Sequence, residues 1–207
     1  MRLLFLSITG QCNRECIHCP MSKWRNNPEY PDSLTLKDCI KAIGFLEPTH
    51  CEITGGEPTL VPWLGELCDY LESKGIIYLV KSNGLRRCKN QITAWHDNVS
   101  EPPVNYDKVL IIATDDWQEK QDYCLANNMP FKIIGFNNSS LVNFRRNAST
   151  FFVCPDGRIK QCHVQESESL LHVGHIGTEH EKTPKWIAKC VSCKAVDDFI
   201  IFLEQLQ

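Results

Sequence analysis

The chain has 207 residues, of which 43% are hydrophobic and 23% charged, and its formal net charge at pH 7 is −3. This length and composition suit one globular domain, with room for a small appendix. The balance of charge gives no overall attraction to nucleic acid or to an anionic membrane. The apolar run at residues 3–6 is too short for a signal peptide, and no window reaches the roughly 18 apolar residues of a membrane span.

Apolar strands and amphipathic helices alternate over residues 1–137. Strands are predicted at 2–9, 50–54, 76–84, 108–114 and 130–136, and helices at 34–46, 63–75 and 115–128. Ser33 is the predicted N-cap of the first helix, and Gly75 closes the second. The alternation predicts an α/β fold with a parallel sheet. Because about five or six strands fit, rather than the eight of a closed barrel, we predict an open, partial (β/α) barrel.

The pattern changes after a polar linker at residues 138–149. Residues 151–162 predict a β-hairpin that turns at 155–157, and residues 195–206 predict a final amphipathic helix. We therefore predict two units: a barrel core over 1–149, and a small metal-binding module of hairpin and helix over 150–207.

Twelve cysteines are many for this length. Because nothing in the sequence indicates secretion, we expect a cytoplasmic protein whose cysteines bind metal rather than form disulfides. Five of them are scattered over predicted elements and are interpreted as buried thiols without a ligand: Cys39, Cys51, Cys68, Cys88 and Cys124. Nothing in the sequence promotes any of the five to a catalytic thiol.

Cys12, Cys16 and Cys19 lie within eight residues, directly after the first predicted strand. A structural zinc ion takes four ligands, so three thiolates are one too few. A [4Fe–4S] cube has one outside ligand on each iron, and three cysteines would leave one iron open to a small molecule. The residues alone also allow a zinc ion with His18 as its fourth ligand, or cysteines without metal.

Two further segments follow predicted strands: Gly55-Gly56 and the turn at Ser82-Asn83. In a parallel sheet the carboxyl ends of the strands meet at one edge, where ligands bind. We therefore expect the cysteines and these two segments to lie on the same rim.

The spacing Cys12-x3-Cys16-x2-Cys19 resembles the CxxxCxxC signature of the radical S-adenosylmethionine (SAM) enzymes, and GGEP at residues 55–58 resembles their second motif. The resemblance covers nearly the whole chain. It implies that one electron from a [4Fe–4S] cluster cleaves SAM to a 5′-deoxyadenosyl radical, which abstracts hydrogen from a substrate. It also implies an electron donor such as flavodoxin or ferredoxin.

The resemblance implies roles for individual residues. The three cysteines would hold the cluster, Gly55 and Gly56 would let the backbone approach the methionine part of SAM, and Glu57 would accept a hydrogen bond from its amino group. The implied SAM-contacting set is completed by His18, Pro58, Ser82, Asn83, Thr114 and Asp115. Asn83-Gly84 is also an ordinary turn, and Asp115 equally suits a helix cap.

Cys154, Cys162, Cys190 and Cys193 form a second set. Two cysteine pairs are typical of a four-coordinate metal, for which zinc is the ordinary candidate. Given the family, the set resembles the twitch module, a shortened SPASM domain, and this implies an auxiliary [4Fe–4S] cluster. Structural zinc is the alternative.

The substrate is left open. We expect an enzyme that oxidises or rearranges a small metabolite or a residue on a polymer. The alternatives are modification of a nucleotide or nucleic-acid base, peptide tailoring, and a binding protein without turnover. The basic clusters at 86–89 and 145–146 are interpreted as solvated faces, so nucleic acid has little support. The sequence does not indicate which residue would serve as catalytic acid, base or thiol.

Overall fold

The structure is a computed structural model that describes residues 2–16, 19, 25–26, 34–95, 101–112, 116–134, 149–154, 158–160 and 172–175. Some predicted features lie outside these residues: His18, Ser33, Thr114, Asp115, Cys162, Cys190, Cys193 and the helix at 195–206.

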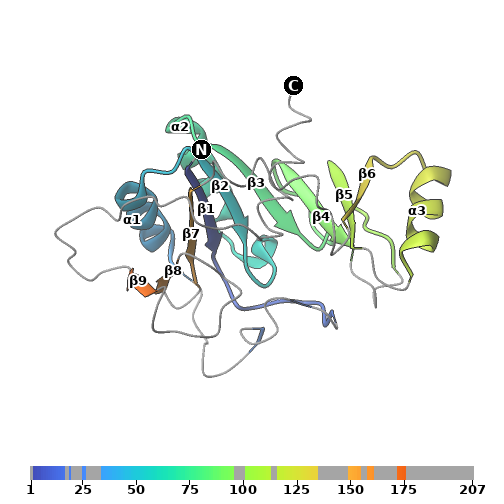
Figure 1. The fold of residues 1–207 in the computed structure, drawn as a ribbon, viewed down its shortest axis with the longest axis horizontal. Helices are drawn as coiled ribbons and strands as arrows, with labels where there is room; N and C mark the ends of the chain where they lie inside the picture. The colour runs from blue at the N-terminus through green and yellow to red at the C-terminus, as the bar shows by residue number, and fades with distance from the viewer. Residues whose placement is uncertain are drawn as a thin grey trace.

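The described strands form one sheet in the order β6-β5-β4-β3-β2-β1-β7-β8-β9 (Figure 1). Their bounds are β1 Arg2–Ser7, β2 His50–Thr54, β3 Ile77–Ser82, β4 Gln91–Trp95, β5 Lys108–Ile112, β6 Phe131–Ile134, β7 Ser149–Val153, β8 Arg158–Lys160 and β9 His172–His175. From β1 to β6 each strand pairs in parallel with the next in the chain. The predicted α/β partial barrel is confirmed.

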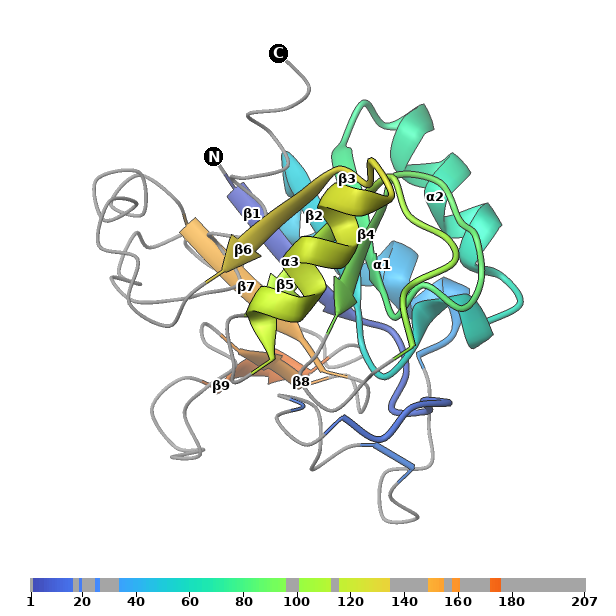
Figure 2. The same cartoon turned by 90° about the vertical axis from the view of Figure 1, so that its right-hand side faces the viewer.

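Helices flank this sheet at two places. Helices α1 (Leu36–Leu46) and α2 (Leu64–Ser73) lie beside β1–β3, and α3 (Trp117–Ala126) lies beside β5 and β6 (Figures 1 and 2). Among the residues that the structure describes, no helix is both long and apolar enough to cross a membrane.

The side of the sheet that α1–α3 cover is its outer face. On β1, alternate residues Leu4, Leu6 and Ile8 join one buried apolar cluster with α1 and α2. At the other end of the sheet, Trp95 and Val109 join a second cluster with α3. Because side chains alternate along a strand, the intervening residues point to the opposite, inner face of the barrel.

Helix α1 begins two residues later than a cap at Ser33 would imply. Its N-cap is Thr35, whose hydroxyl accepts from the Asp38 N–H over 3.2 Å, while the Asp38 carboxylate accepts from the Thr35 N–H over 3.1 Å. This reciprocal pair is a capping box. The predicted cap at Ser33 is wrong because the pair needs a carboxylate three residues after the cap, and Asp38 provides one for Thr35, whereas Leu36 stands three residues after Ser33.

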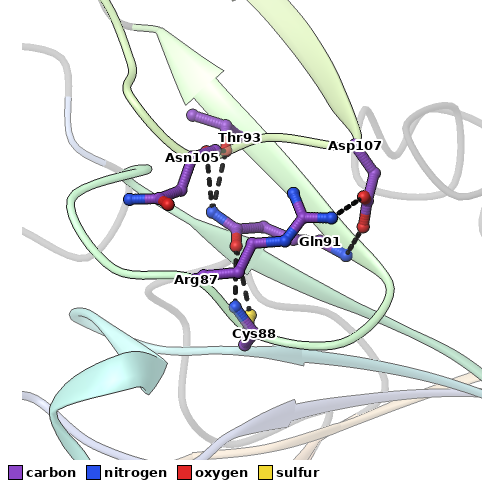
Figure 3. A network of polar contacts seen from close by, with 6 residues as sticks. All are labelled: Arg87, Cys88, Gln91, Thr93, Asn105 and Asp107. Atoms are coloured by element: carbon purple, nitrogen blue, oxygen red, sulfur yellow. Dashed lines mark hydrogen bonds and ion pairs between the residues drawn. The ribbon is translucent and has the colours of Figure 1, made fainter.

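Strand β4 was not predicted from the sequence. The residues between β3 and β4, 83–90, contain no helix, and the outer face of β4 near its start carries polar side chains instead of apolar ones. Gln91 is fully buried and donates to Asn105 O over 2.9 Å, and Thr93 donates to the same oxygen over 2.8 Å. Figure 3 shows this network, which includes Arg87 paired with Asp107.

The predicted hairpin is present as β7 and β8, which pair antiparallel, and β9 extends it. Strand β7 also pairs in parallel with β1, from Arg2 beside Ser149 to Leu6 beside Val153. The first strand of the predicted second unit therefore continues the sheet of the first. The division at residue 149 stays a prediction.

Candidate functional site: a cysteine loop at the carboxyl edge of the sheet

The loops that follow β1 and β2 are joined through their backbones at the carboxyl edge of the sheet. The Gly56 N–H donates to Thr9 O over 2.6 Å, and the Glu57 N–H donates to Gln11 O over 2.7 Å. The cysteine loop (residues 10–16 and 19) is thus held directly against the glycine loop (residues 55–57). Two of the segments expected on one rim lie side by side.

Three thiols of the cysteine loop are close to one another. Burial raises the pKa of the Cys12 thiol above its ordinary value, and the nearby Glu57 and Cys19 raise it further. Burial also raises the pKa of Cys16, and Cys19 and Cys12 add to the effect. All three side chains are half-buried. Thiols with a raised pKa keep their protons at neutral pH until a metal ion displaces them.

The number of these thiols suits a [4Fe–4S] cluster that leaves one iron open. The described residues include no group of three or more His, Cys, Asp or Glu side chains placed to share one ion. An iron–sulfur cube binds each cysteine through a different iron. Cys12, Cys16 and Cys19 could therefore hold a [4Fe–4S] cluster.

Two residues that the sequence did not single out hold the cysteine loop in shape. The Asn26 side chain accepts from the Cys12 N–H and donates to Cys12 O, each over 3.0 Å. Its own N–H donates to Gly10 O over 3.0 Å. Arg25 donates to Cys16 O over 3.1 Å. Because Asn26 lies 14 positions after Cys12, only the folded loop reveals the pairing.

The two glycines of the glycine loop are required by the packing of the chain itself. Gly55 has a φ of +141°, and a Cβ there would lie 2.5 Å from Thr9 O. A Cβ on Gly56 would lie 2.1 Å from Gln11 O. Both distances are far below a van der Waals contact, so any side chain would push the cysteine loop away. The implied approach to the methionine part of SAM stays a prediction.

Glu57 is fully buried and ties the glycine loop to β3. Its Oε1 accepts from the Thr59 N–H over 3.0 Å, the Thr59 hydroxyl over 2.6 Å and the Ser82 hydroxyl over 2.9 Å. Its Oε2 accepts from the Asn83 N–H over 2.7 Å. Glu57 also caps the short 3₁₀ helix Pro58–Leu60. The predicted contact with a SAM amino group would add to this set.

The turn after β3 completes the rim. The Asn83 side chain donates to Asn13 Oδ1 in the cysteine loop over 2.7 Å and accepts from the Leu85 N–H over 3.1 Å. The Gly84 N–H donates to the Ser82 hydroxyl over 3.1 Å. The third segment expected on the rim is therefore in contact with the first, and its turn geometry is a local reason for the Asn-Gly pair.

Only Cys154 of the second cysteine set lies within the described residues. It follows β7, whose Val153 stands beside Leu6, so Cys154 leaves the sheet next to the end of β1. The remaining members, Cys162, Cys190 and Cys193, lie outside the described residues, as do His18, Thr114 and Asp115.

The five scattered cysteines are packed into the protein as expected. Four are buried: Cys39, Cys51, Cys68 and Cys124. Burial raises the pKa of the half-buried Cys88 to about 12, and its thiol donates to Gln91 Oε1 over 3.6 Å (Figure 3). Such a thiol is a poor nucleophile at neutral pH.

The basic residues 86–89 are exposed, as expected of a solvated face, and each has a partner in the chain. Arg86 donates to Thr59 O over 3.3 Å, and Lys89 pairs with Asp69 over 2.8 Å. Arg87 pairs with Asp107, as described above. The three charges are therefore engaged in holding loops together.

The chain resembles several known proteins. It is 32% identical to the mycofactocin maturase MftC of Mycobacterium tuberculosis over 79 residues, which are 38% of this chain and 20% of MftC. It is 23% identical to the 7-carboxy-7-deazaguanine synthase of Haemophilus influenzae over 185 residues, which are 86% of this chain and 76% of that enzyme. No family model matches the chain.

A solved structure supports the fold. SuiB of Streptococcus suis bound to S-adenosylmethionine has a TM-score of 0.56 at 13% identity, covering 77% of this chain and 60% of SuiB. SuiB bound to the precursor peptide SuiA has a TM-score of 0.55 at 10% identity, covering 78% of this chain and 59% of SuiB. The chain thus spans about a fifth of MftC and three fifths of SuiB. The relatives and the structural neighbour are radical SAM enzymes.

Proposed function

We propose that the chain is a radical SAM enzyme, which cleaves SAM reductively at the cysteine loop and uses the resulting radical to abstract hydrogen from a substrate. One arrangement carries this proposal. Three mutually close thiols on the loop after β1 are locked to the glycine loop after β2 by the Gly56 and Glu57 backbone amides.

We assign one group of residues to binding the cluster and another to positioning the backbone around it. Cys12, Cys16 and Cys19 would hold a [4Fe–4S] cluster through three of its irons, and SAM would take the fourth. When bound, the cluster supplies the electron that splits SAM into methionine and a 5′-deoxyadenosyl radical. Glu57 and Asn83 hold the surrounding backbone in place. Rigid positioning matters here because a radical reacts with whichever hydrogen donor is nearest.

The second cysteine set would hold an auxiliary [4Fe–4S] cluster that exchanges an electron with the substrate, and structural zinc is the competing assignment. The position of Cys154 supports a site close to the cysteine loop, since it follows β7 directly beside the end of β1. The electron for the first cluster would come from a donor such as flavodoxin or ferredoxin, in a reducing compartment such as the cytoplasm.

The substrate would be a small molecule or a residue on a polymer, which the enzyme oxidises or rearranges. Names of relatives support both classes: one makes a deazaguanine, and SuiB binds a precursor peptide. Modification of a nucleotide or nucleic-acid base is the second candidate, favoured for a base by the likeness to the deazaguanine synthase over 86% of this chain. Binding of a long nucleic acid has less support, since the basic residues at 86–89 are paired within the chain.

The test is to measure iron, sulfide and zinc in anaerobically reconstituted protein, together with EPR spectra and 5′-deoxyadenosine formed after reduction with SAM. The wild type is compared with the triple variant Cys12→Ala/Cys16→Ala/Cys19→Ala. Two cubes predict about eight irons in the wild type and about four in the variant, and 5′-deoxyadenosine from the wild type alone.

Other results would change the assignment. About four irons falling to none, with one zinc retained, would make the second site structural zinc while leaving SAM cleavage intact. Equal iron in wild type and triple variant, or no 5′-deoxyadenosine from the loaded wild type, would overturn the proposed function.

A further inference from the structure

The chain returns to the cysteine loop at Asn26, whose side chain binds both backbone polar groups of Cys12. Its Oδ1 accepts from the Cys12 N–H and its Nδ2 donates to Cys12 O, each over 3.0 Å. The Asn26 N–H also donates to Gly10 O over 3.0 Å. A carboxamide combines a donor with an acceptor, as a peptide group does, so Asn26 holds Cys12 as a neighbouring strand would. An aspartate would keep only the acceptor.

The contribution of Asn26 lies in these hydrogen bonds rather than in packing. Its side chain is exposed, so its removal opens no cavity in the core. Its backbone is left-handed, with a φ of +51°. Asparagine adopts this conformation more readily than most residues, and glycine adopts it freely. A glycine at this position would therefore remove the side-chain bonds to Cys12 while leaving the backbone path unstrained.

Other contacts fix the loop on both sides of Cys12. Gln11 O accepts from a backbone N–H of the glycine loop over 2.7 Å. Asn13 Oδ1 accepts from the Asn83 side chain, in the turn after β3, over 2.7 Å. Cys12 lies between these two anchors, and Asn26 supplies the bonds to its own backbone. These contacts together set the direction in which the chain leaves Cys12.

The backbone amide two residues after Cys12 donates to the Cys12 sulfur. The distance from the Arg14 N–H nitrogen to Cys12 Sγ is 3.4 Å, in a partly buried setting. A neutral thiol is a weak acceptor, whereas a negatively charged sulfur accepts a hydrogen bond more strongly. Hydrogen bonds to the sulfurs are among the features that set the reduction potential of an iron–sulfur cluster. They favour reduction because the reduced cluster carries one more negative charge.

We propose that Asn26 is a positioning residue: it holds the Cys12 backbone so that the Arg14 N–H remains on Cys12 Sγ, and it thereby raises the reduction potential of the cluster that Cys12 helps to bind. This inference rests on the proposed function, which supplies the cluster. Without the Asn26 side chain, the Cys12 backbone would bond to water, and the Arg14 N–H would no longer be held toward the sulfur. The hydrogen bonds themselves are present without a cluster, so they can be tested separately.

The test compares Asn26→Gly with Asn90→Gly, a matched control. Asn90 lies between β3 and β4, is exposed like Asn26, and has nearly the same φ, +50°. Glycine therefore suits both backbones. In the metal-free proteins, NMR measures hydrogen exchange of the Cys12 and Arg14 amides. In the reconstituted proteins, iron analysis reports cluster loading, and a redox titration followed by EPR gives the midpoint potential. Wild-type SAM cleavage is measured in parallel.

We expect exchange of both amides to be about tenfold faster in Asn26→Gly than in the wild type. The midpoint potential should become more negative by about 59 mV, which corresponds to a tenfold less favourable one-electron reduction. Asn90→Gly should match the wild type in both measurements. In metal-free Asn26→Asp, which keeps the acceptor, the Cys12 amide should remain protected. A role in folding alone would not move the potential of a loaded cluster.

Equal exchange in Asn26→Gly and the wild type, or an equal potential in the two loaded proteins, would overturn the proposal even if SAM is cleaved. Faster exchange with little iron in a folded Asn26→Gly variant would support it, because cluster loading would then depend on the same bonds. A lower potential in Asn26→Gly, without 5′-deoxyadenosine from the loaded wild type, would instead refute the proposed function and leave Asn26 as a positioning residue.

Discussion

The loop after β1 and the loop after β3 both begin at the carboxyl edge of the sheet and both carry partly buried cysteine with a raised pKa, yet their thiols have different neighbours. On the cysteine loop, three partly buried thiols lie near enough to affect one another's pKa. On the loop at 83–90, Cys88 is the one cysteine. Its backbone N–H and its thiol both donate to Gln91, and burial followed by the nearby Cys68 of α2 raises its pKa. Both loops follow a strand, so this position alone does not make a thiol a metal ligand. The neighbours of the thiol decide that.

The difference between the two loops can be tested directly by removing one thiol from each loop. Cys16→Ser should abolish loading of the first cluster, because a hydroxyl is a poor ligand for iron–sulfur clusters. Cys88→Ser should leave the iron content unchanged. Iron analysis and EPR on the two reconstituted variants would check this. Loss of iron from both variants, or from neither, would mean that the two loops do not differ as described.

Alkylation of the metal-free protein tests the reactivity of the Cys88 thiol. The pKa of Cys88 is raised to about 12, so its reactive thiolate becomes the major form only above that pH. At pH 10 its thiolate fraction is about a hundredth of that of an ordinary thiol. We expect iodoacetamide to modify Cys88 about a hundredfold more slowly than an unfolded control, as measured by peptide mass spectrometry. Rapid modification at pH 8 would contradict the buried environment.

The glycine loop can be tested by adding one methyl group. Gly56→Ala would place a Cβ 2.1 Å from Gln11 O, which forces the two loops apart. We expect a loss of about 3 kcal/mol or more in the free energy of unfolding, together with poor cluster loading. Gly44→Ala is the control, since a Cβ at that helical position meets nothing within 4 Å. It should stabilise the protein by about 0.5–1 kcal/mol. Equal stability of the two variants in denaturant titrations would refute the packing argument.

A smaller effect is expected from the polar network beside Cys88 (Figure 3). Gln91→Leu removes the Oε1 that accepts from the Cys88 N–H and the Nε2 that donates to Asn105 O, both in a buried setting. The unfolding free energy should fall by about 2 kcal/mol. Gln118→Leu, on the exposed surface of α3, should change it by less than about 0.5 kcal/mol. The cluster content of both variants should match the wild type, and a loss of iron in Gln91→Leu would show that the two loops are coupled.

Much of the fold was predictable because local pattern and tertiary environment agree. The strands that became β1, β2, β3, β5 and β6 are apolar runs, and α1 and α2 have helical spacing. Strand β4 escaped prediction because Gln91 and Thr93 occupy its outer face, where the usual covering helix is replaced by hydrogen bonds to Asn105. Strands are predicted from their pattern of apolar residues, and buried polar residues such as these do not produce that pattern.

Most strands and helices, the three cysteines of the cysteine loop and the glycine loop could be identified from the sequence alone. Spacing along the chain is enough to specify these features. Only the tertiary structure decided which distant residues meet. It brought Asn26 to the backbone of Cys12, and it set Val153 beside Leu6, so that Cys154 follows β7 next to the end of β1. The physical reason is register: hydrogen bonding between strands sets which side chains share a row, and no local pattern in the chain encodes that alignment.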